Sequence, residues 1–373
     1  MSGRRKTITI LDGSVAVTGA LISAREMARV LRDDVNVELV LPANAVLDKH
    51  SLRDFTRVHR LPIRPLRRSL LAVLLYLPYL IVASIRLRVL LWRNGTDTLL
   101  VNDFYLIHGS LARLLGYRGR VITWIRIAPA AFGRIASLWL WLAGRTSNQV
   151  VAVSQFIQRL LPSGMASTVL YDPISSEFVP EPKPSSQNHD HVFVYLANYI
   201  PGKGQDVAIE ALAQVVRSLP DTRIEFYGGD MGLKKNIDFR SALEMRASEL
   251  GLQDSVKFYN FTSSPRSVLL GKFCALNLSL SESFSRTVLE ASACALPVIA
   301  TRCGGPEEII DDGSTGFLIP VGDTASCAAA MLSLCATPLL GERLGATGRV
   351  RVMEKFSHET FRPQLRGLLK WSR

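Results

Sequence analysis

The sequence predicts an α/β protein built from two domains, each with a parallel β-sheet of the Rossmann-like type. Short apolar runs alternate with helical patterns along the whole chain, as expected for parallel sheets covered by helices. The 373 residues are enough for two domains of ordinary size. Residues 181–190 are rich in Pro, Ser and Asn and lack periodicity, so we place the domain boundary there. Residues 1–180 then form the first domain and residues 181–355 the second.

The first domain opens with a strand pattern at residues 7–11, a loop of small residues and an amphipathic helix over residues 20–32. Gly19 lies in that loop, but the spacing GxGxxG is missing, so by itself this glycine indicates only a helix entry. Further strands are expected at 36–41, 98–102, 119–124 and 149–153, and further helices end near Leu115, cover 135–143 and end at Leu161.

The second domain repeats the alternation of strands and helices. Strands are expected at 192–196, 223–227, 256–259, 275–280, 298–300 and 316–320. Helices are expected from 205 to 217, from near 286 to before Pro297, at 324–336, at 339–354 and from 356 to 371. The two domains are similar in pattern, although their sequences are not.

The positive charge is concentrated in the first part of the chain. The net charge is +12, and residues 1–150 hold 22 Lys and Arg against 9 Asp and Glu. This asymmetry implies an anionic partner for the first domain: membrane lipid, a lipid-diphosphate acceptor or nucleic acid. No nucleic-acid recognition motif accompanies the arginines, so we expect no nucleic acid among the partners.

An apolar run at residues 69–85 is flanked by arginines on both sides. The run has 17 uncharged residues, fewer than the roughly 20 of a spanning helix, and we expect Pro78 to break it. Three interpretations remain: a buried helix, a membrane-surface element and a membrane-spanning segment. The short length of the run fits the spanning segment least. Trp92, Trp139 and Trp141 are either interfacial anchors or core residues.

The cysteines and histidines suggest neither a disulfide framework nor a metal site. The five cysteines are odd in number and form no CxxC, so we interpret them as reduced thiols of a cytoplasmic protein. His189, Asp190 and His191 lie in the polar linker and are expected to be solvated. No long apolar run follows the basic start, so we expect no secretory signal.

Two carboxylates, Glu282 and Glu290, stand eight residues apart around an expected strand-to-helix turn. The start of a helix offers N–H groups and a positive dipole end, which suit a phosphate. A carboxylate one turn into the helix, such as Glu290, can accept hydrogen bonds from a neutral diol of a ribose or hexose. These features suggest a nucleotide-sugar site, although a turn with two solvated acids would show the same spacing.

A second loop with phosphate-binding character follows the strand at 192–196. Gly202, Lys203 and Gly204 at the mouth of a helix bring backbone N–H groups and an ammonium group near one point, as a diphosphate requires. The Walker spacing is absent, so this loop is not a P-loop. A solvated turn lysine is the alternative for Lys203.

The block from Glu282 to Pro320 closely resembles the donor-binding block of glycosyltransferase family 4, the retaining enzymes of GT-B fold. The resemblance is carried by ESFSRTVLE at 282–290, CGGPEEIIDDG at 303–313 and GFLIP at 316–320. The rest of the chain is similar more loosely, including YDPI at the place of the domain-linking turn at 171–174. The resemblance implies an interdomain cleft and a C-terminal helix, residues 356–373, that crosses back to the first domain.

The resemblance also implies roles for individual residues. Glu290 would hold the ribose hydroxyls, Glu282 the hydroxyls of the donor sugar, and Lys203 would neutralise the diphosphate. Backbone amides would hold the sugar or the diphosphate at Phe284, Ser285, Arg286 and Thr287. Asn198 stands where the family usually has a diphosphate-binding Arg, and the loop of Gly19 would let donor and acceptor approach the backbone. No metal and no cofactor are expected, because the nucleotide-sugar is a substrate.

The implied activity is retaining transfer of a hexose from a UDP- or GDP-sugar to a glycan or lipid-linked acceptor, in synthesis of cell-envelope polysaccharide or lipopolysaccharide. The expected location is cytoplasmic, peripheral on the inner face of the membrane through residues 53–93.

Four residues depart from the pattern of the family. They are Asn198, Ser285 where the family often has Gly, Arg286 beside the sugar, and Arg126 near the place where the family commonly has a His. Arg126 is either an anion-binding residue or a surface residue. The alternatives are an epimerase-type GT-B enzyme and a non-catalytic subunit of a glycan-synthesis complex.

Overall fold

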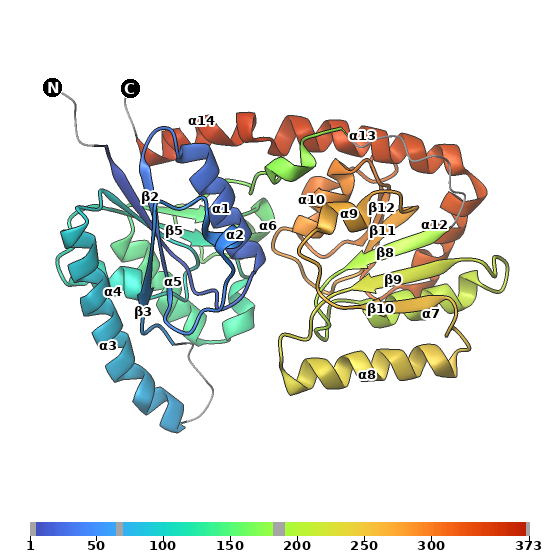
Figure 1. The fold of residues 1–373 in the computed structure, drawn as a ribbon, viewed down its shortest axis with the longest axis horizontal. Coiled ribbons are helices and arrows are strands. Elements are labelled where there is room, and N and C mark those ends of the chain that lie inside the picture. Colours follow the sequence, from blue (N-terminus) through green and yellow to red (C-terminus); the bar gives the residue numbers. More distant parts are fainter. Residues whose placement is uncertain (1–4, 65–69, 182–190, 371–373) are drawn as a thin grey trace. The chain divides into compact units, whose positions relative to one another are not determined.

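The computed structural model describes residues 5–64, 70–181 and 191–370, which divide into two units. The first unit comprises Met1–Pro173 and His358–Arg373, and the second comprises Ile174–Ser357 (Figure 1). The division falls at the turn 171–174 and not in the linker at 181–190, of which residues 182–190 lie outside the described residues. Residues 174–178 belong to the second unit because Ile174 donates to the carbonyl oxygen of Phe356 at 2.8 Å and Phe178 is buried there.

The first unit has a sheet in the order β3-β2-β1-β4-β5-β6-β7, in which every described pairing is parallel. Its strands are β1 (Thr7–Leu11), β2 (Asn36–Pro42), β3 (Arg57–Leu61), β4 (Thr98–Val101), β5 (Arg120–Ile125), β6 (Gln149–Ala152) and β7 (Thr168–Val169). Its helices are α1 (Gly19–Leu31), α2 (Lys49–Leu52), α3 (Leu70–Arg93), α4 (His108–Leu114), α5 (Ile135–Thr146), α6 (Gln155–Arg159) and α14 (His358–Leu369), with a 3₁₀ turn at Pro129–Phe132.

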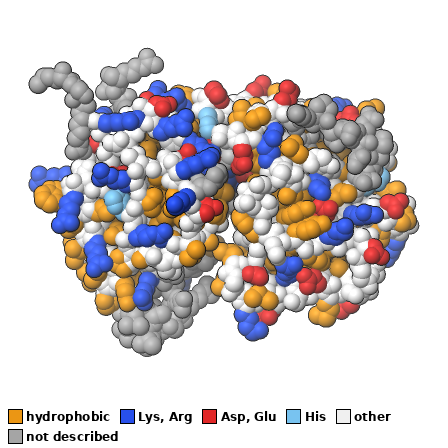
Figure 2. All heavy atoms as spheres, viewed as in Figure 1, with side chains coloured by type: hydrophobic (Ala, Val, Ile, Leu, Met, Phe, Trp, Pro, Cys, Tyr) orange, Lys and Arg blue, Asp and Glu red, His pale blue; other side chains and the backbone are white. Residues whose placement is uncertain are grey.

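Helices cover both faces of this sheet, and each face has its own apolar core. On one face, α1 and α14 pack on the sheet, and Phe361, Leu365 and Leu368 of α14 are buried among the side chains of β1 and β2. On the other face, α3 and α4 pack on the sheet through Ala83, Leu87 and other apolar residues. Lys and Arg side chains are spread over the surface of this unit in the view of Figure 2.

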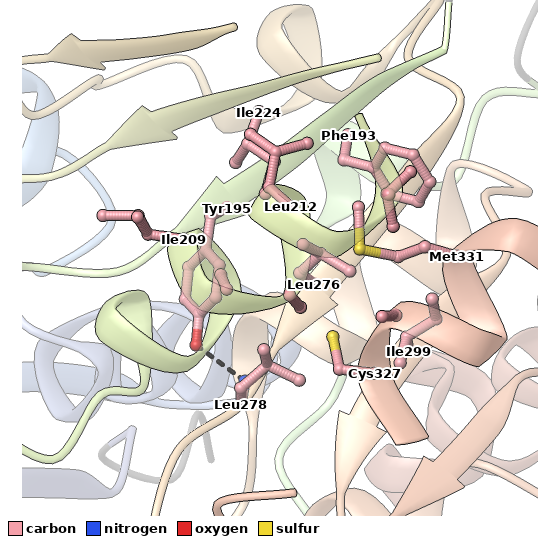
Figure 3. Close-up of a cluster of buried hydrophobic side chains, with 14 of the residues drawn as sticks. Phe193, Tyr195, Ile209, Leu212, Ile224, Leu276, Leu278, Ile299, Cys327 and Met331 are labelled. Atoms are coloured by element: carbon pink, nitrogen blue, oxygen red, sulfur yellow. Dashed lines mark hydrogen bonds between the residues drawn. The ribbon is translucent and has the colours of Figure 1, made fainter. Parts of the chain in front are cut away.

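The second unit has a parallel sheet in the order β10-β9-β8-β11-β12-β13. Its strands are β8 (Val192–Leu196), β9 (Arg223–Tyr227), β10 (Val256–Tyr259), β11 (Cys274–Asn277), β12 (Val298–Thr301) and β13 (Phe317–Ile319). Its helices are α7 (Gln205–Val215), α8 (Lys234–Glu249), α9 (Pro265–Leu269), α10 (Arg286–Ala293), α11 (Pro306–Ile309), α12 (Thr324–Ala336) and α13 (Pro338–Phe356), with a 3₁₀ turn at Ser176–Phe178. Figure 3 shows the core in which Tyr195, Leu276 and Met331 meet.

Two expected elements differ from the structure for local reasons. The strand expected at 275–280 ends at Asn277, because Asn277 turns its side-chain amide to Ser285 and Thr287 and the next backbone N–H bonds to Tyr195. The break expected at Pro78 was wrong, since α3 runs through it. Pro78 lies on the exposed side of α3, where water can satisfy the carbonyl oxygen that its ring leaves without a donor.

Helix α3 does not qualify as a membrane span. Within the described ranges, no single helix is both long and apolar enough to cross a bilayer. One bent pair, Thr324–Ala336 with Pro338–Leu369, meets the requirement by length and composition only.

The five cysteines are free and buried, and burial raises the pKa of the Cys303 thiol to about 11.

Candidate functional site

The candidate site lies at the carboxyl ends of β8 and β11 in the second unit. The chain leaves β8 towards β9 and β10 on one side, and β11, β12 and β13 lie on the other. In open parallel sheets, the loops that diverge at such a point leave room for a ligand. The loops after β8 and β11 contain Lys203, Glu282 and the other residues singled out in the second half of the sequence.

Glycines let these loops pack against each other. Gly204 has a φ of +80°, and a Cβ there would overlap the carbonyl oxygen of Leu278. In the loop after β12, which packs against the loop after β11, a Cβ on Gly305 would lie 2.6 Å from the Cα atom of Phe284. Both positions therefore need glycine for close approach of two backbones, and Gly204 also needs it for its positive φ.

Tyr195 of β8 links the loop after β8 to the loop after β11 through its side-chain hydroxyl. Its hydroxyl donates to the carbonyl oxygen of Lys203 and accepts the backbone N–H of Leu278 at 2.6 Å (Figure 3). The ring is fully buried, and burial raises the pKa of its hydroxyl well above the usual value, so it stays protonated and can donate. Sequence analysis missed this residue because a tyrosine inside an apolar strand pattern indicates only core packing.

Lys203 and Glu282 form an ion pair across the two loops. The Lys203 Nζ atom lies 2.7 Å from Glu282 Oε1, and Ser279 Oγ donates to the same oxygen at 2.9 Å. The Lys203 side chain is 30% exposed, so part of it remains accessible to a ligand. The backbone of Glu282 is held by Cys303 and Gly305, through bonds of 3.1 and 2.7 Å. The structure thus brings together two residues that lie 79 positions apart.

Helix α10 begins at Arg286, directly after its N-cap residue Ser285. Ser285 occupies the N-cap position without a capping side-chain bond, because its Oγ accepts the Asn277 amide at 2.9 Å. The same amide donates to Thr287 Oγ1 at 3.1 Å. The helix itself provides no acceptors for its first N–H groups, so this end is suited to an anionic group. Phe284, just before it, is buried against Phe356, with ring centroids 5.5 Å apart.

Glu290 lies on α10 one turn after Arg286 and is 6% exposed. The Arg286 Nη2 atom donates to Glu290 Oε1 at 3.3 Å and to Ser175 Oγ at 2.8 Å. Arg286 therefore holds the carboxylate in place and ties it to the segment where the second unit begins. The sequence marked Arg286 as a departure, but its contact with Ser175, 111 residues away, had no local signal.

Asn198 does not substitute for a cation in this structure. Its Oδ1 accepts the backbone N–H of Gly229 at 3.0 Å, and its carbonyl oxygen accepts from Gln205 at the same distance. Gly228 packs so closely against Ala197 that a Cβ would overlap the carbonyl oxygen there. Asn198 thus joins the loops after β8 and β9, and Lys203 is the cation described on this loop.

Gly19 belongs to the first unit, at the first position of α1 after the N-cap Thr18. The corresponding end of the first-unit sheet holds a buried polar network. Arg126 Nη1 lies 2.8 and 2.7 Å from the two carboxylate oxygens of Asp172, and Arg126 Nε donates to Asn102. Arg126 is 7% exposed, so the surface-residue alternative was wrong. Ser23 also donates to Asp172, at 2.6 Å.

Two carboxyl groups complete this network, and sequence analysis missed both. Asn102 donates to Asp12, and Asp103 accepts the backbone N–H groups of Phe104 and Arg126. Burial raises the pKa of Asp103 to about 7, and its φ of 156° lies outside the usual range for a non-glycine residue. A polar residue directly after an apolar strand is the signal that marks Asp12 and Asn102. No group of three or more potential His, Cys, Asp or Glu metal ligands occurs among the residues the structure describes.

Comparison with known proteins adds to this geometry. A structure of Anabaena Alr3699/HepE in complex with UDP and glucose superposes with a TM-score of 0.84 at 21% identity, covering 99% of this chain and 100% of that one. Sucrose-phosphate synthase from Thermosynechococcus elongatus gives a TM-score of 0.81 at 19% identity, covering 98% of each chain. Two Rossmann-like parallel-sheet units with these neighbours define a protein of GT-B fold.

Sequence comparison then gives the family. Residues 180–351 match the family "Glycosyl transferases group 1". A GDP-mannose-dependent alpha-(1-6)-phosphatidylinositol monomannoside mannosyltransferase of Mycolicibacterium smegmatis is 26% identical over 71% of this chain and 73% of its own. The putative glycosyltransferase EpsD of Bacillus subtilis is 34% identical over 43% of this chain and 40% of its own, less than half of that relative. Residues 180–351, less than half of the chain, match the group 1 family, the resemblance to glycosyltransferase family 4 is confirmed, and the chain is a glycosyltransferase.

Proposed function

We propose that the chain is a retaining glycosyltransferase that moves a hexose from a nucleotide-diphospho-sugar to a glycan or lipid-linked acceptor. The observation that carries the proposal is the Lys203–Glu282 ion pair at the carboxyl ends of β8 and β11, next to helix α10, whose N-cap Ser285 makes no capping side-chain bond and which holds Glu290 one turn after its start. These groups provide a cation, a helix N-terminus and two carboxylates, which match the diphosphate and the hydroxyl groups of such a donor.

In this proposal, the donor diphosphate lies at the start of α10 and competes with Glu282 for Lys203. The first N–H groups of α10 and the Lys203 ammonium stabilise the charge that grows on the diphosphate as the glycosidic bond breaks. Fixed donors at such a point contribute several kcal/mol to catalysis. Glu282, once separated from Lys203, accepts hydrogen bonds from the donor sugar. Glu290, held by Arg286, accepts them from the ribose hydroxyls.

The nucleotide is proposed to be UDP or GDP. The HepE structures are described with UDP and with UDP-glucose, and the mycobacterial relative is described as GDP-mannose-dependent. The acceptor class is proposed from the same relative, whose name specifies a phosphatidylinositol monomannoside, and from the basic first unit. A soluble donor and a lipid-linked acceptor meet at a membrane surface, so we place the reaction on the cytoplasmic side of the membrane, in envelope polysaccharide or lipopolysaccharide synthesis.

The first test is thermal unfolding of the chain with UDP, GDP, ADP and their sugar conjugates. A ligand at about 100 times its Kd stabilises the folded state by about 2.7 kcal/mol, so selective stabilisation by one nucleotide would name the donor base. Glu290→Ala should reduce the donor affinity at least tenfold, because a charged hydrogen bond contributes about 1.5–3 kcal/mol. Glu342→Ala, at an exposed position of α13, is the matched control.

Turnover separates this proposal from the alternatives. Lys203→Ala should lower the rate of transfer on the order of a hundredfold, as loss of one charge-stabilising donor does, whereas Lys235→Ala on α8 should leave it unchanged. Donor binding without transfer to any glycan acceptor would favour a non-catalytic subunit. Release of nucleotide with an altered sugar and no acceptor would favour an epimerase-type enzyme. Unchanged donor affinity in Glu290→Ala would contradict the site assignment.

A further inference from the structure

Helix α3 of the first unit has an apolar side that no other described element covers. Its exposed apolar side chains are Leu77, Ile81, Val82, Ile85, Val89 and Trp92, and Trp92 is 71% exposed. At 3.6 residues per turn these six positions fall within an arc of roughly 140°, along a stripe roughly 22 Å long. Most large apolar side chains exposed on a protein surface are scattered singly, so a stripe on one helix indicates a partner.

The opposite side of α3 is fixed to the unit. Leu80, Ala83, Leu87 and Leu91 are buried, and three of them are in the core shared with β1, β4 and β5. If α3 left the unit and inserted across a bilayer, this core would be exposed to water. The exposed stripe can therefore meet an apolar phase only from the side, with α3 parallel to the surface of that phase.

The neighbouring helices extend the stripe into a surface. Helix α3 packs against α4, and α4 packs against α5, so the three form one layer on the same face of the sheet. On α5, Ile135, Leu138 and Trp141 are exposed at the i, i+3 and i+6 positions of one helix side. In Figure 2, hydrophobic side chains and side chains coloured as Lys or Arg are interspersed on the first unit in the region of α3. We call this layer, α3 to α5 with its exposed apolar side chains, the helix-layer surface.

Arginines lie beside the apolar side chains of the helix-layer surface. Arg86 and Arg93 are exposed next to the apolar arc of α3, and the Arg145 guanidinium lies 4.7 Å from the ring centroid of the exposed Trp141. Residues 55–171 contain 15 Arg, no Lys, no Glu and two Asp. This excess would make two copies of the surface repel each other and favours an anionic partner. Nucleic acid would neutralise the arginines but leave the apolar stripe in water.

We propose that the helix-layer surface docks on a bilayer that contains anionic lipids, with the apolar side chains of α3 and α5 at the acyl boundary and the arginines at the headgroups. The proposal deepens the membrane location proposed above and adds α4 and α5 to the segment 53–93. It does not depend on the donor site, which lies in the second unit. A helix that is apolar on one side and cationic beside it binds in this way, through buried apolar area and attraction to anionic lipids.

The test is sedimentation of the full chain with vesicles of equal parts phosphatidylcholine and phosphatidylglycerol, and with phosphatidylcholine alone. Binding should favour the anionic vesicles and weaken at high salt, because salt screens the arginines. Ile81→Gln with Ile85→Gln should lower the partition coefficient at least tenfold. Arg86→Gln with Arg93→Gln should lower it roughly fivefold per arginine. Leu339→Gln with Val350→Gln, which are exposed on α13, should leave it unchanged.

Three results would overturn the proposal. The first is no binding to anionic vesicles at low salt, and the second is an equal effect of the α13 control pair. The third is a dimer in solution that the α3 pair abolishes while vesicles are ignored, which would make the surface an interface between two copies. The donor-induced thermal shift should be unchanged in the α3 pair, so a failed donor site and a failed membrane surface give different results.

Discussion

The two units have the same arrangement of central strands but use the corresponding loops differently. In the first unit, the loops after β1, β4 and β5 hold Asp12, Asn102 and Arg126, which bond to one another and to Asp172 in a buried network. In the second unit, the loops after β8 and β11 are shaped by glycine and hold a partly exposed ion pair, Lys203 and Glu282. The sheet topology thus places polar loops at the carboxyl ends of the strands in both units. Burial makes those of the first unit a stabilising polar network, whereas glycine-shaped packing leaves those of the second unit open as a candidate binding site.

The largest effect should come from breaking the first-unit anchor. Arg126→Ala leaves the Asp172 carboxylate buried without its cation, which should lower the free energy of unfolding by about 3–5 kcal/mol. Four tryptophans, Trp92, Trp124, Trp139 and Trp141, lie in the described part of the first unit, and residues 174–357 contain none, so tryptophan fluorescence in urea reports on the first unit. Circular dichroism in urea follows the second unit as well. Arg302→Ala removes the partner of Asp312 in an exposed pair and should change stability by less than about 1 kcal/mol. If the two substitutions changed the free energy of unfolding equally, the buried Arg126–Asp172 pair would stabilise the protein no more than an exposed pair does.

The second effect tests whether glycine shapes the donor loops. Gly204→Ala combines a positive φ with an overlap at Leu278 and should destabilise the second unit by about 2–4 kcal/mol, with loss of the donor-induced thermal shift. Gly322 has a φ of +76° and open space at its Cβ position, so Gly322→Ala should cost only about 1–2 kcal/mol and keep the donor response. Circular dichroism in urea measures both. A donor response that survived Gly204→Ala would show that close packing of these loops is dispensable.

The smallest effect is a pH dependence in which two groups of the first unit oppose each other. Asp103 has its pKa raised to about 7, so the folded state binds more protons than the unfolded state between about pH 4 and pH 7, and stability falls as pH rises. His108 has its pKa lowered by burial to about 4, so its contribution to stability rises with pH between about pH 4 and pH 6.5. The contributions of these two groups should therefore largely cancel in the wild type across this range.

Single variants should reveal the two opposed slopes, each of at most about 1.4 kcal/mol per pH unit. Asp103→Asn leaves the rising contribution of His108, and His108→Gln leaves the falling contribution of Asp103. Tryptophan fluorescence in urea at a series of pH values measures both. If neither variant changed the pH dependence, the carboxyl group would not be buried as described.

Patterns in the sequence predicted most strands and most helices because their signals are local. The strands 7–11, 192–196 and 256–259 and the helix at 324–336 have the bounds expected from apolar periodicity. Strand β3 (Arg57–Leu61) was not expected, since its arginines and histidine hide the alternation on an edge strand. Helix α8 was also not expected, because only a few of its residues are buried and its apolar pattern is weak.

The sequence by itself determined the class of this protein. The alternation of strands and helices is a local feature, and it indicated two parallel-sheet domains. The resemblance of residues 282–320 to glycosyltransferase family 4 rests on a continuous stretch of sequence, and it implied the GT-B fold and a glycosyltransferase. Only the tertiary structure decided which groups meet. Lys203 reaches Glu282, Arg286 reaches Ser175, and Arg126 is buried against Asp172. Such contacts join positions 46 to 111 residues apart, and sheet topology, not local propensity, brings them together.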